Sequence, residues 1–174
     1  MSARRSRSLP AIAAGAFLAA VTGCQSARVA GRSDIVRVST FYSSQDVWLN
    51  FDQPPTLVPQ GFKCSVFLTP AEGEQGAFGD GTIKFEIYRV DRDEQGAGAN
   101  TLVHTESFEK ERAYGYRGRI PKRYGWGYGF RIPWGEADLR GQEIMVVVSF
   151  VRKDGRTIAG QPKYFKVPMV ARIP

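Results

Sequence analysis

The sequence predicts an all-β protein, a single antiparallel β-sandwich of the immunoglobulin-like or a related type. Three observations lead to this prediction. Short segments rich in Val, Ile, Phe and Tyr recur along the chain, and Gly, Pro and Asp separate them at fairly regular intervals. After residue 23, no stretch keeps helical periodicity for more than about two turns. Many short strands with regularly spaced turns are typical of a sandwich.

Several segments have the composition of strands, in chain order 35–42, 47–51, 62–68, 82–90, 101–108, 143–151 and 157–167. In 82–90, Ile83, Phe85 and Ile87 alternate with polar residues, the period of two that a half-buried antiparallel strand needs. That segment and 101–108 form a predicted hairpin. An Asp-Gly pair joins the last two segments and predicts a second hairpin, in which Pro162 marks an edge or bulge. The charged link 109–112 is expected to hold one helical turn.

The first 23 residues have the three parts of a secretory signal peptide. Arg4, Arg5 and Arg7 supply the positive start, and a chargeless run from Leu9 to Val21 follows. That run is too short to cross a bilayer core of roughly 30 Å as a helix. An ordinary signal peptide and a twin-arginine export signal are the alternatives, but the residues after Arg5 lack the apolar pair that the latter carries.

The signal ends in Val21-Thr22-Gly23-Cys24, which resembles the lipobox of bacterial lipoproteins at all four positions. The resemblance implies cleavage before Cys24, acylation (palmitate) of that cysteine, and lipid attachment to a membrane of the cell envelope. Gln25, in place of Asp, favours the outer membrane by analogy with enteric sorting. We therefore expect a signal peptide over 1–23, a lipidated cysteine and tether over 24–34, and a sandwich domain over 35–174.

Removal of the signal changes the charge of the chain. The full sequence carries 24 Lys and Arg against 17 Asp and Glu, for a net charge of +7. Residues 1–23 hold three arginines and no acids, so 21 basic residues remain and the net charge falls to +4. This mild excess does not indicate nucleic-acid binding. With Cys24 acylated, Cys64 has no disulfide partner and is expected to be a buried thiol.

The body of the chain resembles small β-sandwich lipoproteins of planctomycete-type bacteria. The resemblance covers most of residues 36–168. It rests on the lipobox and on the strand-like segments 81–88, 130–134 and 161–168. It implies a sandwich body and brings no activity, cofactor or partner with it.

The stretch from Tyr114 to Trp134 combines seven aromatic residues with interleaved arginines. Between residues 124 and 130, aromatic residues alternate with glycine, which predicts a strand with an aromatic face and a bare face. One interpretation places the rings in the core and the glycines beneath a bulky neighbour. The other is a binding face for envelope glycan, where rings stack on sugars and cations pair with anionic groups. The candidate ligand-binding residues are Tyr124, Trp126, Tyr128, Arg123 and Arg131.

No motif in the chain indicates catalysis or a metal centre. The segment from Asp91 to Gly96 begins like a calcium loop, but Leu102 stands where that loop requires Glu, so a solvated hairpin loop is expected. His104 is the lone histidine and is expected on the surface of a strand. A carboxylate pair acting without a motif stays open among 17 acidic residues,. We predict a protein that is not an enzyme and needs no cofactor.

The sequence therefore predicts a lipid-anchored envelope protein with a binding or structural role. The favoured ligand is an envelope glycan bound through 114–134. The alternative is an assembly protein that offers a sheet edge, at Phe165–Val167, to a protein partner. Single-stranded nucleic acid uses similar aromatic and basic chemistry, but the modest charge and the predicted export argue against it.

Overall fold

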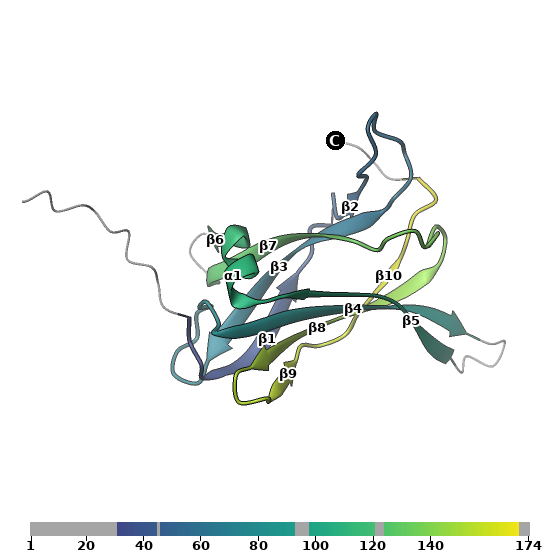
Figure 1. Ribbon diagram of the computed structural model, residues 1–174. Helices are drawn as coiled ribbons and strands as arrows, with labels where there is room; N and C mark the ends of the chain where they lie inside the picture. Colours follow the sequence, from purple (N-terminus) through teal and green to yellow (C-terminus); the bar gives the residue numbers. More distant parts are fainter. Residues whose placement is uncertain (1–30, 45, 93–97, 121–123, 171–174) are drawn as a thin grey trace, which may run out of the picture.

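The structure is a computed structural model that describes residues 31–44, 46–92, 98–120 and 124–170. The predicted signal peptide, Cys24 and Arg123 lie outside these residues. Within them, two antiparallel sheets pack face to face (Figure 1). The predicted antiparallel β-sandwich is confirmed.

The first sheet has the strand order β1-β3-β7-β6, with the short strand β2 also paired to β3. Every pairing in it is antiparallel. The strands are β1 (Ile35–Phe41), β2 (Trp48–Leu49), β3 (Gly61–Pro70), β6 (Arg117–Ile120) and β7 (Gly125–Pro133). The long strands β3 and β7 lie at its centre, so they hold the middle of both faces.

The second sheet has the order β10-β8-β4-β5, and β9 pairs with β8 on the same side as β10. Its strands are β4 (Gly81–Arg92), β5 (Gly98–Phe108), β8 (Glu143–Arg152), β9 (Thr157–Ala159) and β10 (Lys163–Lys166). The hairpin predicted for 82–90 and 101–108 is confirmed as β4 and β5. The link after β5 forms α1 (Lys110–Ala113) and the 3-10 turn η1 (Tyr114–Tyr116), which confirms the expected helical turn.

The segment 157–167, predicted as one strand, is two. Strands β9 and β10 both pair with β8, and residues 160–162 between them are not in a strand. Pro162 explains the break, because it has no N–H to donate to a ladder. The predicted strand 47–51 is reduced to the two residues of β2.

Aromatic side chains fill the space between the sheets. Phe130 of β7 lies 5.1 Å from Phe85 of β4 and 4.5 Å from Phe108 of β5, measured between ring centroids. Tyr116 covers the same cluster from the 3-10 turn at 4.9 Å. Rings at these separations and tilts interact favourably beyond the area that they bury. This cluster fixes β7 against the second sheet.

The chain joins the body before the predicted start of the domain. The Arg32 N–H donates to the carbonyl of Phe78 at 2.6 Å, and the Asp80 N–H donates to the carbonyl of Arg32 at 2.8 Å. Residues from 32 onward therefore belong to the packed body. Residues 32–34, expected to be part of the tether, are part of the domain.

The two faces of β7 differ sharply in side-chain size. Tyr128, Phe130 and Ile132 are buried on the inner face. On the outer face, Gly127 lies beneath the Phe67 ring, and a Cβ added there would come within 2.8 Å of Cδ1. A Cβ added at Gly129 would meet nothing within 4 Å. The first glycine is thus required by packing, whereas the second leaves the surface open.

This difference can be tested with two matched substitutions. We expect Gly127→Ala to lower the free energy of unfolding by about 1–3 kcal/mol, because the new methyl group meets Phe67 and the Val66 carbonyl,. Gly129→Ala should leave stability unchanged or raise it by about 0.4–1 kcal/mol. Denaturant unfolding measures both, and equal effects would contradict the assigned packing.

Candidate functional site

The predicted aromatic row does not lie on one face. Gly125 has φ = +75°, and this left-handed conformation breaks the alternation at the start of β7. Tyr124 packs against Phe67 on the outer face, with ring centroids 5.1 Å apart. Trp126 packs against Phe78, at 5.4 Å. The expected aromatic face is therefore wrong at Tyr124, whereas Tyr128 and Phe130 share the inner face and lie in the core, as the core interpretation predicts.

Tyr128 belongs to the core and does not face solvent. It is 1% exposed, and its hydroxyl accepts a hydrogen bond from the Gly79 N–H at 3.0 Å. Burial raises the pKa of its phenol,. The prediction of Tyr128 as a ligand-binding residue is therefore wrong, because neither face of the buried ring is accessible to a ligand.

Tyr124 and Trp126 keep exposed ring surface. Tyr124 is 45% exposed and Trp126 is 41% exposed. The Gly76 N–H donates to the Tyr124 carbonyl at 2.8 Å, and the Trp126 N–H donates to the Gly76 carbonyl at 3.1 Å. Both residues are thus held at the end of the first sheet, away from its centre. Of the two predicted arginines, Arg131 is described and exposed on β7.

A groove of about 470 Å³ lies on the outer face of the first sheet. It crosses β1, β3 and β7, where Phe41 is the register partner of Ser65, and Ser65 that of Gly129. Phe41 is 55% exposed. The lining residues are Phe41, Ser43, Lys63, Cys64, Ser65, Gly129, Phe130 and Arg131. Ser65 and Gly129, which are small, form the floor of the groove, and the larger side chains of Phe41 and Arg131 stand beside it.

Two cations stand side by side at one end of this groove. Lys63 and Arg131 are register partners on β3 and β7. Lys63 forms an ion pair with Asp46, and the hydrogen bond from Lys63 holds the pKa of Asp46 below its usual value. No ion pair to Arg131 exists among the described residues. Arg131 is therefore the cation that a ligand can engage without displacing a carboxylate.

Cys64 lies beneath the groove with its side chain in the core. It is a free, buried cysteine, and burial raises the pKa of its thiol,. The prediction of a buried thiol is confirmed. A neutral, inaccessible thiol contributes packing here and not nucleophilic chemistry.

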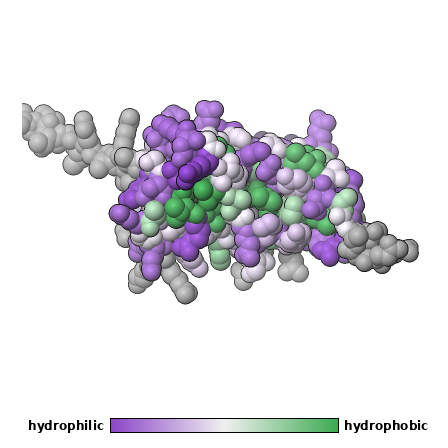
Figure 2. Space-filling view, turned by 90° about the horizontal axis from the view of Figure 1, so that it is seen from below, coloured by the Kyte–Doolittle hydropathy of each residue, from purple (hydrophilic) through white to green (hydrophobic). Residues whose placement is uncertain are grey.

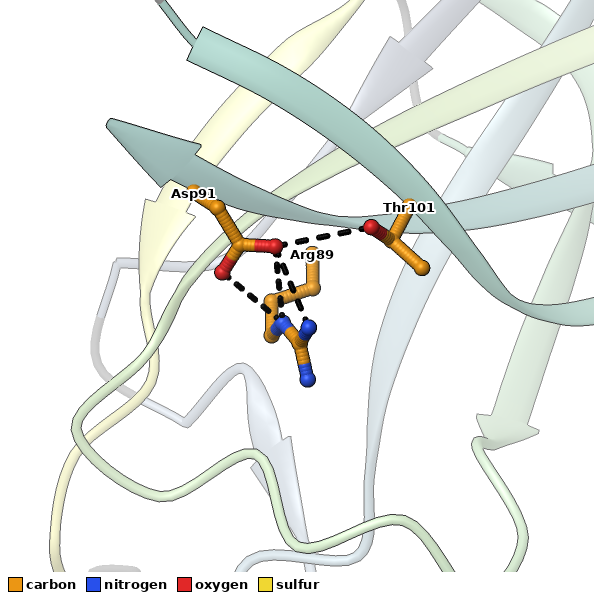
Figure 3. Close-up of polar contacts among 3 residues, drawn as sticks. All are labelled: Arg89, Asp91 and Thr101. Atoms are coloured by element: carbon orange, nitrogen blue, oxygen red, sulfur yellow. Dashed lines mark hydrogen bonds and ion pairs between the residues drawn. The ribbon is translucent and has the colours of Figure 1, made fainter. Parts of the chain in front are cut away.

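The start of the calcium-like segment is engaged within the β4–β5 hairpin. Figure 3 shows the Asp91 carboxylate accepting hydrogen bonds from the Arg89 guanidinium, at 2.9 Å for the shortest, and from the Thr101 hydroxyl at 3.4 Å. Residues 93–97 lie outside the described residues. Within the described ranges, no cluster of three His, Cys, Asp or Glu side chains has the geometry to hold a metal ion.

His104 is not the surface residue that the sequence predicts. Its side chain is only 24% exposed and stands 3.9 Å from Glu106, measured from Nε2 to Oε2. Glu106 is in turn bound by the Arg112 guanidinium at 2.5 Å. This arrangement holds a carboxylate between two basic side chains.

Apolar surface is dispersed on the side of the molecule seen in Figure 2. Hydrophobic residues form small patches there, separated by hydrophilic ones. Among the described residues, no helix has the length and apolar character needed to cross a bilayer.

Comparisons with known proteins place the chain in no family. No protein-family model matches the sequence, and no curated protein matches it. Among solved structures, the chain is similar to MtrC from Shewanella baltica OS185 at a TM-score of 0.42 and 11% identity, over 77% of this chain and 22% of that one. A likeness at this level carries no argument about function. The lipobox and the planctomycete-type resemblance stay predictions.

Sequence reasoning found Arg131 but missed Phe41, Lys63 and Ser65 as members of one site. The sequence did hint at the exposure of Phe41. In the predicted strand, Phe41 is an odd number of positions after Val38, so it faces away from that buried residue,. Its groove partners come from strands far along the chain, and only the register joins them.

The corrected role of Tyr128 makes a direct prediction. We expect Tyr128→Ala to destabilise the fold by about 3–5 kcal/mol, because it removes a large core ring and leaves the Gly79 N–H without its acceptor. Trp126→Ala should lower stability by no more than about half as much, since much of that ring is already in solvent,. Thermal unfolding of both variants tests this. A small loss of stability in Tyr128→Ala would contradict the placement of that ring in the core.

Proposed function

We propose that this protein is a lipid-anchored component of the bacterial cell envelope that binds an anionic envelope glycan in the groove across β1, β3 and β7. The observation that carries the proposal is the groove itself, with an exposed ring, an available cation and a floor of small residues. It moves the predicted glycan site from the aromatic row to the opposite face of the same strand. Arg131 is the candidate residue that the two versions share.

The groove residues suit a sugar polymer with negative groups. Phe41 offers a ring face against which the C–H face of a sugar can pack, and this contact buries apolar surface,. Arg131 presents a planar guanidinium that matches a carboxylate or phosphate with two parallel hydrogen bonds. Gly129 and Ser65 let the polymer approach the sheet closely. Such contacts bind a ligand and need no catalytic group.

The anchor is the second half of the proposal. The lipobox and the three-part signal support cleavage before Cys24 and acylation of that cysteine,. More than one acyl chain gives stable membrane attachment. Gln25 favours the outer membrane, and the face of that membrane is left open.

The alternative function is assembly through a sheet edge. Strand β10 lies at the end of the second sheet and pairs with β8 alone, which favours this reading. The predicted edge at Phe165–Val167 is less suited to it, because Val167 is buried and its N–H already donates to the Gln142 carbonyl. Lysines at both ends of β10 are also the residues that protect edges from pairing,. The groove therefore has the stronger support.

Glycan binding can be tested by co-sedimentation of the purified protein with cell-wall and outer-surface polysaccharide at low and high salt. We expect binding that persists at high salt through Phe41 and weakens about tenfold or more in Arg131→Gln, the effect of losing a charge-assisted hydrogen bond of about 1.5–3 kcal/mol. Phe41→Ala should weaken binding at both salt concentrations.

A matched pair of substitutions separates the groove from the rest of the face. Gly129→Val raises the groove floor, while Gly118→Val places the same side chain on β6 outside the groove, and an added Cβ meets nothing within 4 Å at either site. Only the first should reduce binding. Equal binding by both variants argues against the groove, and no binding by the wild type at either salt concentration turns attention to the sheet-edge alternative.

The anchor has its own measurement. Intact mass spectrometry of protein extracted from membranes should give a chain that begins at Cys24 and carries added acyl mass. Cys24→Ser should abolish both the added mass and membrane retention. A full-length, unmodified chain in the membrane fraction would contradict the lipoprotein prediction.

A further inference from the structure

Tyr124 and Trp126 stand at the end of the sandwich where the chain from Cys24 enters. Arg32 is hydrogen-bonded to the Phe78 carbonyl at 2.6 Å, and the Phe78 ring lies 5.4 Å from that of Trp126. In Figure 1, the first described residues lie at the same end as β6 and the start of β7, whereas the end of β4 and the start of β5 lie at the opposite end. We call Tyr124 and Trp126 the aromatic end.

The length of the tether keeps this end close to the anchored residue. Gly31 lies seven positions after Cys24, and a fully extended chain over seven steps spans at most about 25 Å. Strand β4 alone has 12 residues, which at the usual rise per residue is roughly 40 Å. When Cys24 is held at a bilayer, the aromatic end is therefore the part of the body nearest to the lipid. This step rests on the anchor in the proposed function.

The two rings have the chemistry of residues that settle at a membrane–water interface. Tyr and Trp combine an apolar body with one polar group and are enriched at the level of the lipid headgroups. Each ring here is supported from beneath, Tyr124 by buried Phe67 and Trp126 by buried Phe78. That support holds the exposed faces outward and limits their freedom before docking.

Among the described residues, two acidic side chains and one ion pair lie where the chain enters this end. Arg32 is paired with Asp34 at 2.6 Å, and its hydrogen bond lowers the pKa of Asp34 to about 2, so both groups stay charged and paired at neutral pH. Glu72 and Glu74 are exposed in the loop that leads to Gly76. Contact through the rings, with little dependence on salt, is the mode that fits these residues.

We propose that the aromatic end docks on the bilayer that holds the lipid anchor, with Tyr124 and Trp126 at headgroup level and the sandwich standing above the surface. The partner is a lipid surface, which the rings contact without requiring anionic headgroups. Docking at this end leaves the groove across β1, β3 and β7 clear of the membrane, open to a polymer in the surrounding envelope.

The test uses the full lipidated chain reconstituted into phosphatidylcholine vesicles with bromine placed high on the acyl chains. Tryptophan fluorescence should fall by up to about one third relative to unbrominated vesicles, because one of three tryptophans reaches the interface,. The quenching should disappear in Trp126→Phe and persist in Trp48→Phe, whose residue lies on β2 among core side chains. It should also persist at about 0.5 M salt, where charge attraction is screened.

Two failures are distinguishable. Protein that floats with the vesicles but shows no bromine quenching, or quenching that Trp126→Phe leaves unchanged, would overturn docking and leave the anchor intact. Protein that does not float with the vesicles at all would remove the anchor, and the docking proposal would fall with it.

Discussion

The packing of β7, at the centre of the first sheet, against the second sheet is the constraint on which the other features depend. Phe130 meets rings from β4, β5 and the 3-10 turn, so the inner face of β7 is committed to large side chains. The outer face of the same strand is then free to carry glycine. At Gly127 a neighbour takes up the space, and at Gly129 nothing does. The groove is the part of that face left uncovered.

Most of the fold was predictable, because its strands follow a period of two that is visible in the sequence. Ile83, Phe85 and Ile87 are all fully buried, as their alternation predicts. The same reasoning failed at Tyr124, because Gly125 adopts a positive φ and the alternation of β7 begins only after it. Glycine accepts that conformation about as readily as others, so the sequence does not reveal where an alternating pattern is interrupted.

The candidate site was less accessible to sequence reasoning than the fold. Phe41 and Arg131 are 90 positions apart in the chain, and they meet through the registers of β1 with β3 and of β3 with β7. A slip of one residue in either register would turn one of them to the core. The sequence showed that glycines make a bare face on β7, but it could not show that Phe67 covers part of it, since this depends on which strand lies alongside.

The pairing of β1 with β3 has a mechanical consequence. Under the proposed function, the anchored segment would pull on β1 from its Ile35 end, while a polymer held at Arg131 would pull on β7, which reaches β1 through β3. Such tension would load the β1–β3 and β3–β7 pairs along the strand direction. The ladder hydrogen bonds run perpendicular to the strands, so they share this load together instead of opening one after another. A sandwich paired in this way would resist a pull along its strands between a bilayer and a polymer.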